Sequence, residues 1–202
     1  MQVVGLVAGF QSNPKETHVV AVKRIFIYLK GAMDYGLWHR KCQDFTLKEF
    51  TDVDWEESVD DRKSTSGATF FLGNCLVSWL SKKQSSIALY TIEVEYIVVA
   101  SCCTQVIWKN QTLEGLLVKY DHPIVINCDN TSAINISKNP IMHSKTKYIP
   151  IKYHFLRYQV SQKVVKLQYD DTKEQIVDNF IKPQTKEAFE HIRKKMGIIS
   201  LK

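Results

Sequence analysis

The chain has 202 residues, of which 45% are apolar and 24% are charged, a composition typical of globular proteins that excludes disordered and fibrous chains. No apolar run approaches the roughly 18 residues that span a bilayer, and residues 1–30 lack a signal-peptide pattern, so we expect neither a membrane protein nor a secreted one. The five cysteines are an odd number without a C-x-x-C pair, which favours an intracellular, reducing compartment over a disulfide framework or a zinc site.

The formal net charge of +6 is distributed unevenly along the chain. Residues 130–169 contain seven basic residues and no aspartate or glutamate. Such a block is either a solvated face or a surface for polyanions such as nucleic acids, and the charge alone does not decide between them.

The first half of the chain predicts one helix and then three strands. Apolar residues recur at helical spacing over residues 17–29 and Gly31 follows as a stop, so we expect an amphipathic helix there. Turn residues and a basic cluster come next, and they indicate a domain boundary near residue 42. Three further segments have strand patterns, the last two joined by a Gly-Asn hairpin turn, and they lie at residues 46–55, 68–72 and 75–80.

The second half predicts helices alternating with two strands. Thr91 can cap a long helix over residues 91–119, and residues 124–128 are typical of a strand buried on both faces. The remaining expected elements are helices over residues 132–137, 151–162, 174–181 and 186–196 and a strand over residues 164–169. This order predicts an α/β fold with a mixed five-stranded sheet, three antiparallel strands and then two parallel ones, with flanking helices.

Four acids stand out by their expected positions. Asp52 lies within the first strand, Glu95 lies early in the long helix, Asp129 ends the central strand, and Asp178 follows the last strand. A carboxylate in or at the end of a buried strand destabilises the fold unless a positive group pairs with it. A divalent cation such as Mg²⁺ is one such group, because it prefers carboxylate oxygens.

A series of short sequence motifs surrounds these acids in unbroken order over about residues 44–197. They are Asp52-Val53-Asp54-Trp55, Asp60-Asp61-Arg62-Lys63-Ser64-Thr65-Ser66-Gly67, Val77-Ser78-Trp79, Ser81-Lys82-Lys83-Gln84, Glu93-Val94-Glu95-Tyr96, Cys128-Asp129-Asn130, Lys138-Asn139-Pro140, His143-Ser144-Lys145-Thr146-Lys147, Tyr153-His154-Phe155, Gln175-Ile176-Val177-Asp178 and Lys182-Pro183. In this order they resemble the ribonuclease H domain of copia-type retrotransposon Pol polyproteins. Residues 1–40, with Ser12-Asn13-Pro14 and Tyr28-Leu29-Lys30-Gly31, resemble the last stretch of the reverse transcriptase that precedes that domain.

The resemblance implies a division into three parts. Residues 1–41 would be a helical C-terminal remnant of the reverse transcriptase, residues 42–183 a ribonuclease H-like domain, and residues 184–202 a C-terminal helix and tail. The first part is too short for a polymerase palm, so we expect no polymerase activity.

The resemblance also implies an activity: hydrolysis of the RNA strand of RNA–DNA hybrids with two Mg²⁺ or Mn²⁺ ions. The implied catalytic and metal-binding residues are Asp52, Glu95, Asp129 and Asp178. The candidates for contacts with the backbone of the hybrid are Lys145, Lys147, Lys152 and Arg157. The expected partners are the hybrid and the rest of a Pol polyprotein, with no membrane, and the oligomeric state stays open.

Two alternatives remain beside this interpretation. Glu56-Glu57 replaces a small pair that usually follows the first motif, and Val94, Val98 and Val99 replace small residues on the long helix. Bulkier residues can disturb close packing, which favours an inactive remnant that folds and binds nucleic acid. An integrase-type transferase shares such a sheet, but the order Asp-Glu-Asp-Asp speaks against it.

Overall fold

The computed structural model describes residues 2–41, 44–54, 63–84, 91–118, 123–139 and 151–201. Its elements in chain order are α1 (Gln2–Ala8), α2 (Glu16–Gly31), β1 (Tyr35–Leu37), β2 (Leu47–Asp54), β3 (Thr65–Leu72), β4 (Cys75–Lys83), α3 (Thr91–Gly115), β5 (Ile124–Cys128), α4 (Thr131–Lys138), η2 (Ile151–His154), α5 (Phe155–Ser161), β6 (Val165–Tyr169), η3 (Thr172–Glu174), α6 (Asp178–Ile181), α7 (Lys186–Lys195) and β7 (Ile198–Ser200).

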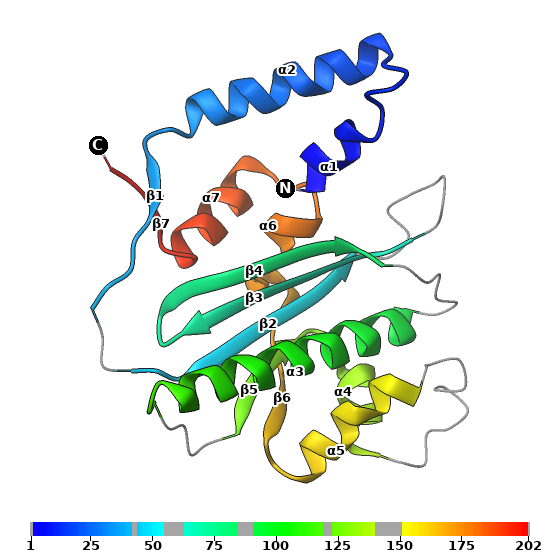
Figure 1. Ribbon diagram of the computed structural model, residues 1–202, viewed down its shortest axis with the longest axis vertical. Coiled ribbons are helices and arrows are strands. Elements are labelled where there is room, and N and C mark those ends of the chain that lie inside the picture. Colours follow the sequence, from blue (N-terminus) through cyan, green and yellow to red (C-terminus); the bar gives the residue numbers. More distant parts are fainter. Residues whose placement is uncertain are drawn as a thin grey trace.

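The centre of the molecule is a five-stranded sheet with the strand order β4-β3-β2-β5-β6 (Figure 1). The strands β4, β3 and β2 are antiparallel, and β2, β5 and β6 are parallel to one another. This confirms the predicted mixed sheet and its ribonuclease H-like arrangement of three antiparallel strands followed by two parallel ones.

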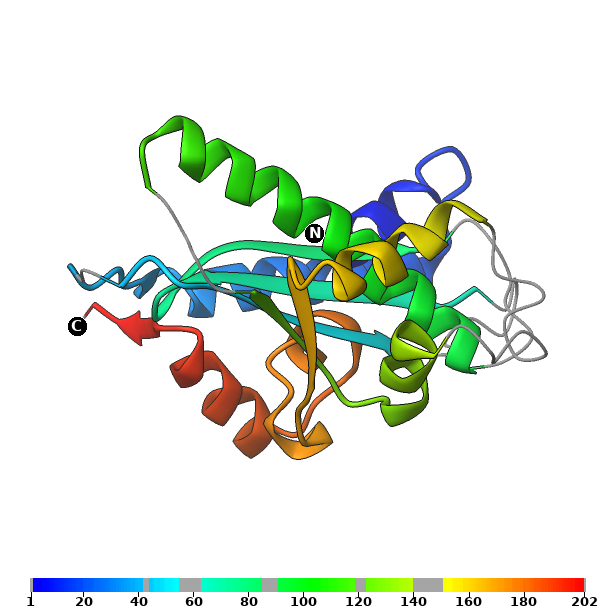
Figure 2. The same cartoon turned by 90° about the horizontal axis from the view of Figure 1, so that it is seen from below.

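Helices cover both faces of the sheet. Figure 2 shows α3 on one side of the sheet and α6 and α7 on the other. The alternation along β2 explains this, because Leu47 and Val53 belong to the main core with α3, whereas Phe50 packs into a smaller cluster with α7. That smaller cluster consists of Phe71, Leu76, Ile176, Ile192 and Met196.

The long helix α3 contributes more buried side chains to the main core than any other described element. Val94, Val98 and Val99, the bulkier residues that could disturb close packing, are all buried in this core. By length and composition α3 could also cross a membrane, but 61% of its most apolar stretch is buried inside the fold. Its apolar side chains therefore serve the contact with the sheet.

Several predicted elements differ from the observed ones. The strand expected over residues 75–80 extends to Lys83, and the helix expected over residues 151–162 is the turn η2 and the helix α5. The strand β3 begins at Thr65 rather than at residue 68, because Thr65 pairs with both Asp54 of β2 and Lys83 of β4. The helix expected over residues 174–181 is instead the turn η3 and the short helix α6, with residues 175–177 between them. These three consecutive residues are all buried, and Val177 lies against Gly67 of β3, so packing on the sheet sets the conformation of this segment.

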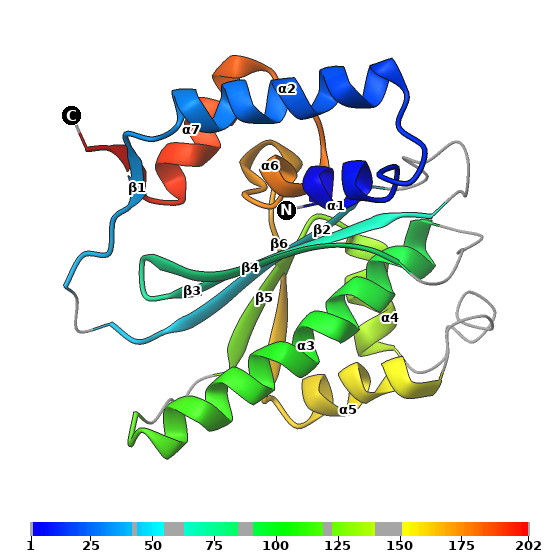
Figure 3. The same cartoon turned by 45° about the horizontal axis from the view of Figure 1, so that its top comes forward.

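A second, two-stranded sheet joins segments that lie far apart in the sequence (Figure 3). The strand β1 pairs with β7 in antiparallel register, from Tyr35 opposite Ser200 to Leu37 opposite Ile198. Two further backbone hydrogen bonds extend it, from Trp38 N–H to the Gly197 carbonyl at 2.8 Å and from the Leu201 N–H to an Asp34 carbonyl at 2.7 Å. Three-residue strands carry no periodic signal, and the sequence analysis does not include them.

Gly67 allows α6 and the residues before it to approach the sheet. It lies on β3 directly opposite Asp52 of β2. A Cβ atom at this position would lie 2.3 Å from Cγ1 of Val177 and 2.7 Å from Cγ2 of Ile181, distances that no real Cβ tolerates. The absence of a side chain at Gly67 therefore brings α6 against the strand pair that carries Asp52.

We expect Gly67→Ala to lower the free energy of unfolding by about 1–3 kcal/mol, because its methyl group overpacks the contact with Val177 and Ile181. Chemical denaturation measures this change. The control is Gly115→Ala, since a Cβ at Gly115 has no atom within 4 Å and should cause no loss of stability. Equal stability of the Gly67 variant and the wild type would contradict the close packing of α6.

Glu49 is a buried acid outside the four candidate site residues. It lies on β2, and its side chain is fully buried, with a relative exposure of 0%. Burial raises the pKa of Glu49 to about 8, and a contact with the Cys102 thiol and the charge of Lys109 only partly oppose this shift. The folded protein therefore keeps a proton on Glu49 at neutral pH.

This proton gives a pH dependence of stability with a definite sign. Above the ordinary Glu pKa of 4.5 the unfolded chain releases the proton, whereas the folded chain keeps it up to about pH 8, so rising pH favours unfolding across this window. Glu49→Gln cannot ionise and lacks this effect. We expect the variant to gain stability relative to the wild type by up to about 1.4 kcal/mol per pH unit across the window, measured by denaturation at several pH values.

The other titrating groups are common to both proteins, and their contributions cancel in the difference between the two. A difference that stays constant from pH 5 to pH 8 would contradict the raised pKa of Glu49.

Candidate metal centre

Two of the predicted site residues lie on neighbouring parallel strands, Asp52 within β2 and Asp129 directly after β5. The last paired residues of β2 and β5 are Thr51 and Cys128, and the next residue along each strand is Asp52 and Asp129, respectively. Beyond Cys128 the chain turns into α4, where the side chain of Asn130 accepts a hydrogen bond from the first turn of that helix. The two carboxylates therefore lie at the same level, where β5 leaves the sheet.

The third acid comes from the beginning of α3. Glu95 lies on the part of the helix that packs on the sheet, and one oxygen atom each of Asp52, Glu95 and Asp129 lies within 4.8 Å of the other two. Asp52 is 1% exposed and Glu95 is 7% exposed, whereas Asp129 is partly exposed. The structure thus brings three of the four predicted site residues into one cluster, which we call the acidic triad.

Burial and mutual repulsion act on the protonation of the triad. Burial and a contact with Asp178 raise the pKa of Asp52 to about 7, although the Lys182 ammonium opposes this shift. Burial raises the pKa of Glu95 as well, and the charges of Asp52 and Asp129 add to the effect. The triad therefore stabilises any positive charge that enters it.

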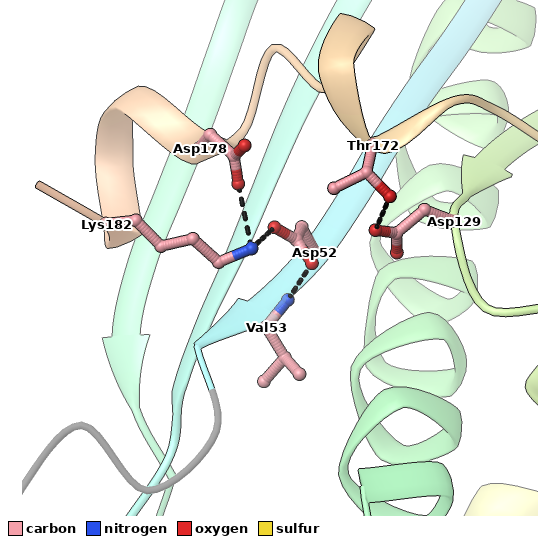
Figure 4. Close-up of polar contacts among 6 residues, drawn as sticks. All are labelled: Asp52, Val53, Asp129, Thr172, Asp178 and Lys182. Carbon is pink, nitrogen blue, oxygen red and sulfur yellow. Dashed lines mark hydrogen bonds and ion pairs between the residues drawn. The ribbon is translucent and has the colours of Figure 1, made fainter. Parts of the chain in front are cut away.

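The fourth predicted acid, Asp178, is linked to Asp52 of the triad by the side chain of Lys182, which contacts both carboxylates (Figure 4). Asp178 is the first residue of α6, and its Oδ1 lies 2.9 Å from Nζ of Lys182. The same Nζ lies 2.5 Å from Oδ2 of Asp52. The ammonium of Lys182 therefore lies between the two carboxylates. Burial alone would lower the pKa of Lys182, but the contacts with Asp52 and Asp178 outweigh burial and raise this pKa.

The remaining contacts of the triad leave one buried oxygen without a hydrogen bond. Oδ1 of Asp52 accepts a hydrogen bond from the Val53 N–H at 2.7 Å, and Oδ2 of Asp129 accepts one from the Thr172 hydroxyl at 2.9 Å. Among the described residues, none donates a hydrogen bond to Oε2 of Glu95, which is buried. A buried carboxylate oxygen without a donor fits a cation ligand, and three carboxylates are a donor set that suits Mg²⁺ or Mn²⁺. The triad could therefore hold a metal ion.

Sequence reasoning assigned no role to Lys182 and Thr172. Two signals pointed to Lys182: the Lys182-Pro183 motif of the resemblance, and its spacing of four residues from Asp178, which is the spacing of neighbours on one helix face. No pattern pointed to Thr172, since its contact with Asp129 connects residues 43 positions apart.

The four candidates for contact with nucleic acid are described only in part. Lys145 and Lys147 lie outside the described residues, as does the side chain of Lys152. Arg157 is partly buried on α5: its Nε donates a hydrogen bond to the Ile136 carbonyl at 3.1 Å, and its guanidinium carbon lies 5.9 Å from the ring centroid of Tyr96.

Comparison with known proteins gives relatives along almost the whole chain. No family model matches the sequence. The chain is 34% identical over 198 residues to the retrovirus-related Pol polyprotein from transposon RE2 of Arabidopsis thaliana, which covers 98% of this chain. It is 35% identical over 195 residues to the corresponding protein from transposon RE1 of the same plant, covering 96% of this chain. It is also 35% identical over 197 residues to that from transposon TNT 1-94 of Nicotiana tabacum, covering 98% of this chain.

The chain spans only 14%, 13% and 15% of the length of these three relatives, so it corresponds to one segment of each. The chain belongs to the family of retrovirus-related Pol polyproteins of copia-type transposons.

Proposed function

We propose that this chain is a metal-dependent endoribonuclease that hydrolyses the RNA strand of RNA–DNA hybrids, as a segment of a retrotransposon Pol polyprotein. The observation that carries the proposal is the acidic triad of Asp52, Glu95 and Asp129, in which Oε2 of Glu95 has no hydrogen-bond donor among the described residues. Divalent ions in such a site stabilise the charge that develops on the attacking and leaving oxygens of phosphoryl transfer.

In this proposal the residues of the chain hold and orient the groups around the scissile phosphate. Asp52, Glu95, Asp129 and Asp178 would hold two Mg²⁺ or Mn²⁺ ions, and the hydroxyl of Thr172 fixes the orientation of Asp129. The burial of Asp52 and Glu95 keeps water from competing for their oxygens, so the site selects a compact, highly charged ligand.

The hybrid would contact the basic stretch of the sequence, residues 130–169. Arg157 lines, together with Lys138 and Ser137, a pocket of about 440 Å³ beside α4 and α5. We infer that Arg157, with Lys145, Lys147 and Lys152, contacts the phosphates of the hybrid, and such contacts position the duplex without reading its sequence. Recognition of RNA would rest on its 2′-hydroxyl groups.

We also propose the context of this activity. Residues 42–183 would form the nuclease domain, residues 1–41 the end of the preceding reverse transcriptase without polymerase activity, and residues 184–202 a C-terminal helix and tail. The hybrid arises where reverse transcription takes place, so the working compartment would be intracellular.

A second candidate function is that of a catalytically inactive remnant that folds and binds nucleic acid. Lys182 favours this candidate, because its ammonium pairs with both Asp52 and Asp178 and offsets part of their negative charge without any metal ion. The two candidates agree on binding to a hybrid and differ in metal-dependent turnover.

The experiment is cleavage of a hybrid with a labelled RNA strand by the purified chain in Mg²⁺ or Mn²⁺. We expect cleavage that requires the ion, and we expect Asp129→Asn to reduce it by at least about 100-fold, because loss of one carboxylate weakens the metal site. Asp129 is chosen since it is the most exposed acid of the triad, and its replacement should perturb the fold least.

The matched control is Glu187→Gln, an exposed acid on α7 outside the triad, which should retain the wild-type rate. Binding of the intact hybrid is measured in parallel by fluorescence anisotropy without divalent ions. Binding without any cleavage would favour the inactive remnant, and cleavage that survives Asp129→Asn would contradict the proposed site.

A further inference from the structure

The ammonium of Lys182 lies within the candidate metal centre rather than beside it. It contacts Oδ2 of Asp52 at 2.5 Å and Oδ1 of Asp178 at 2.9 Å. Figure 4 shows this nitrogen between the two carboxylates, with Asp129 on the other side of Asp52. Asp52 is therefore shared between the other acids of the triad and a cation that belongs to the chain itself.

A metal ion that bridged Asp52 and Asp178 would need the same oxygen atoms. Divalent cations bind carboxylate oxygens at about 2.0–2.6 Å, which is close to the distances at which the ammonium lies. Two cations cannot occupy one position, and their repulsion at such short range is strong in a site that is largely closed to water. Occupation by Lys182 and occupation by a second metal ion therefore exclude each other.

The fold holds Lys182 in this position through α6. The close approach at Gly67 places α6 on the sheet, and the Ser81 hydroxyl donates a hydrogen bond at 2.8 Å to the Phe180 carbonyl. The side chain of Lys182 nevertheless remains 28% exposed, so it can rotate away toward solvent. The position can open without any change in the backbone.

We propose that Lys182 is a built-in competitor for one of the two metal positions, so that the free protein binds a single divalent ion at the acidic triad. A second ion binds between Asp52 and Asp178 only after the Lys182 side chain has moved out. This inference deepens the proposed function and rests on it, since it requires that the triad binds a metal ion.

The test counts bound Mn²⁺ ions by calorimetric titration and by electron paramagnetic resonance, without nucleic acid. We expect one ion per chain for the wild type and two for Lys182→Gln, with the second site at least tenfold tighter than any second site of the wild type. The matched control is Lys166→Gln, an exposed lysine on β6, which should bind one ion. Lys182→Arg retains the charge and should also bind one.

A second measurement uses the wild-type protein alone, since Lys182→Gln leaves two carboxylates without a partner and could fail to fold. Reductive methylation followed by mass spectrometry of peptides reports the accessibility of each lysine. We expect Lys182 to react at least tenfold more slowly than Lys166 in metal-free protein. Equal methylation rates of Lys182 and Lys166 would contradict the contact of the Lys182 ammonium with Asp52 and Asp178.

The outcomes separate this inference from the proposed function. Two ions on the wild type, or one ion on folded Lys182→Gln, would contradict the proposed competition between Lys182 and a second ion. Either result would still be consistent with a metal site at the acidic triad. No bound Mn²⁺ on either protein would overturn the metal site itself, and with it the proposed nuclease.

Discussion

The structure around the site depends on one electrostatic constraint: carboxylates withdrawn from water need a cation. Asp52 is 1% exposed and has two other acids within the reach of a single ion. Desolvated like charges at this distance destabilise the folded state, either by repulsion or by forcing protons onto the acids. Burial and the neighbouring like charges raise the pKa values of Asp52 and Glu95, and the Lys182 ammonium opposes part of this shift.

The fold imposes this constraint through ordinary rules of α/β structure. The parallel pairing of β2 with β5 ends at Thr51 and Cys128, which brings the next residues, Asp52 and Asp129, together. The helix α3 packs on the same strands and places Glu95 beside them. On the opposite face, Gly67 removes the side chain that would keep α6 away. None of these features is unusual alone, and together they gather three acids and one lysine around Asp52.

The sequence alone predicts those parts of the molecule that depend on local periodicity. The alternation along residues 46–55 predicted β2 and the face on which Asp52 lies, and the apolar run before Asp129 predicted β5. The expected positions of Asp52 within a strand, Glu95 early in the long helix and Asp129 at a strand end, combined with the family motifs, selected the three acids of the triad. Which role each acid plays in the cell stays a prediction.

The sequence did not predict features that depend on contacts between distant segments. The contact of Lys182 with Asp52 joins residues 130 positions apart, and no local pattern encodes it. The same holds for the short strands β1 and β7, and for residues 175–177, whose burial between two sheet-facing elements overrides their helical spacing. Tertiary packing decided the conformation in each case.

The pairing of β1 with β7 bears on how such a segment can be isolated from a longer protein. A fragment that starts at the predicted boundary, residue 42, would lack β1 and leave the backbone groups of Ile198, Ile199 and Ser200 without their partner strand. An unsatisfied strand edge with two isoleucines invites pairing between separate molecules. Expression fragments for this protein are therefore better cut before Tyr35 than after it.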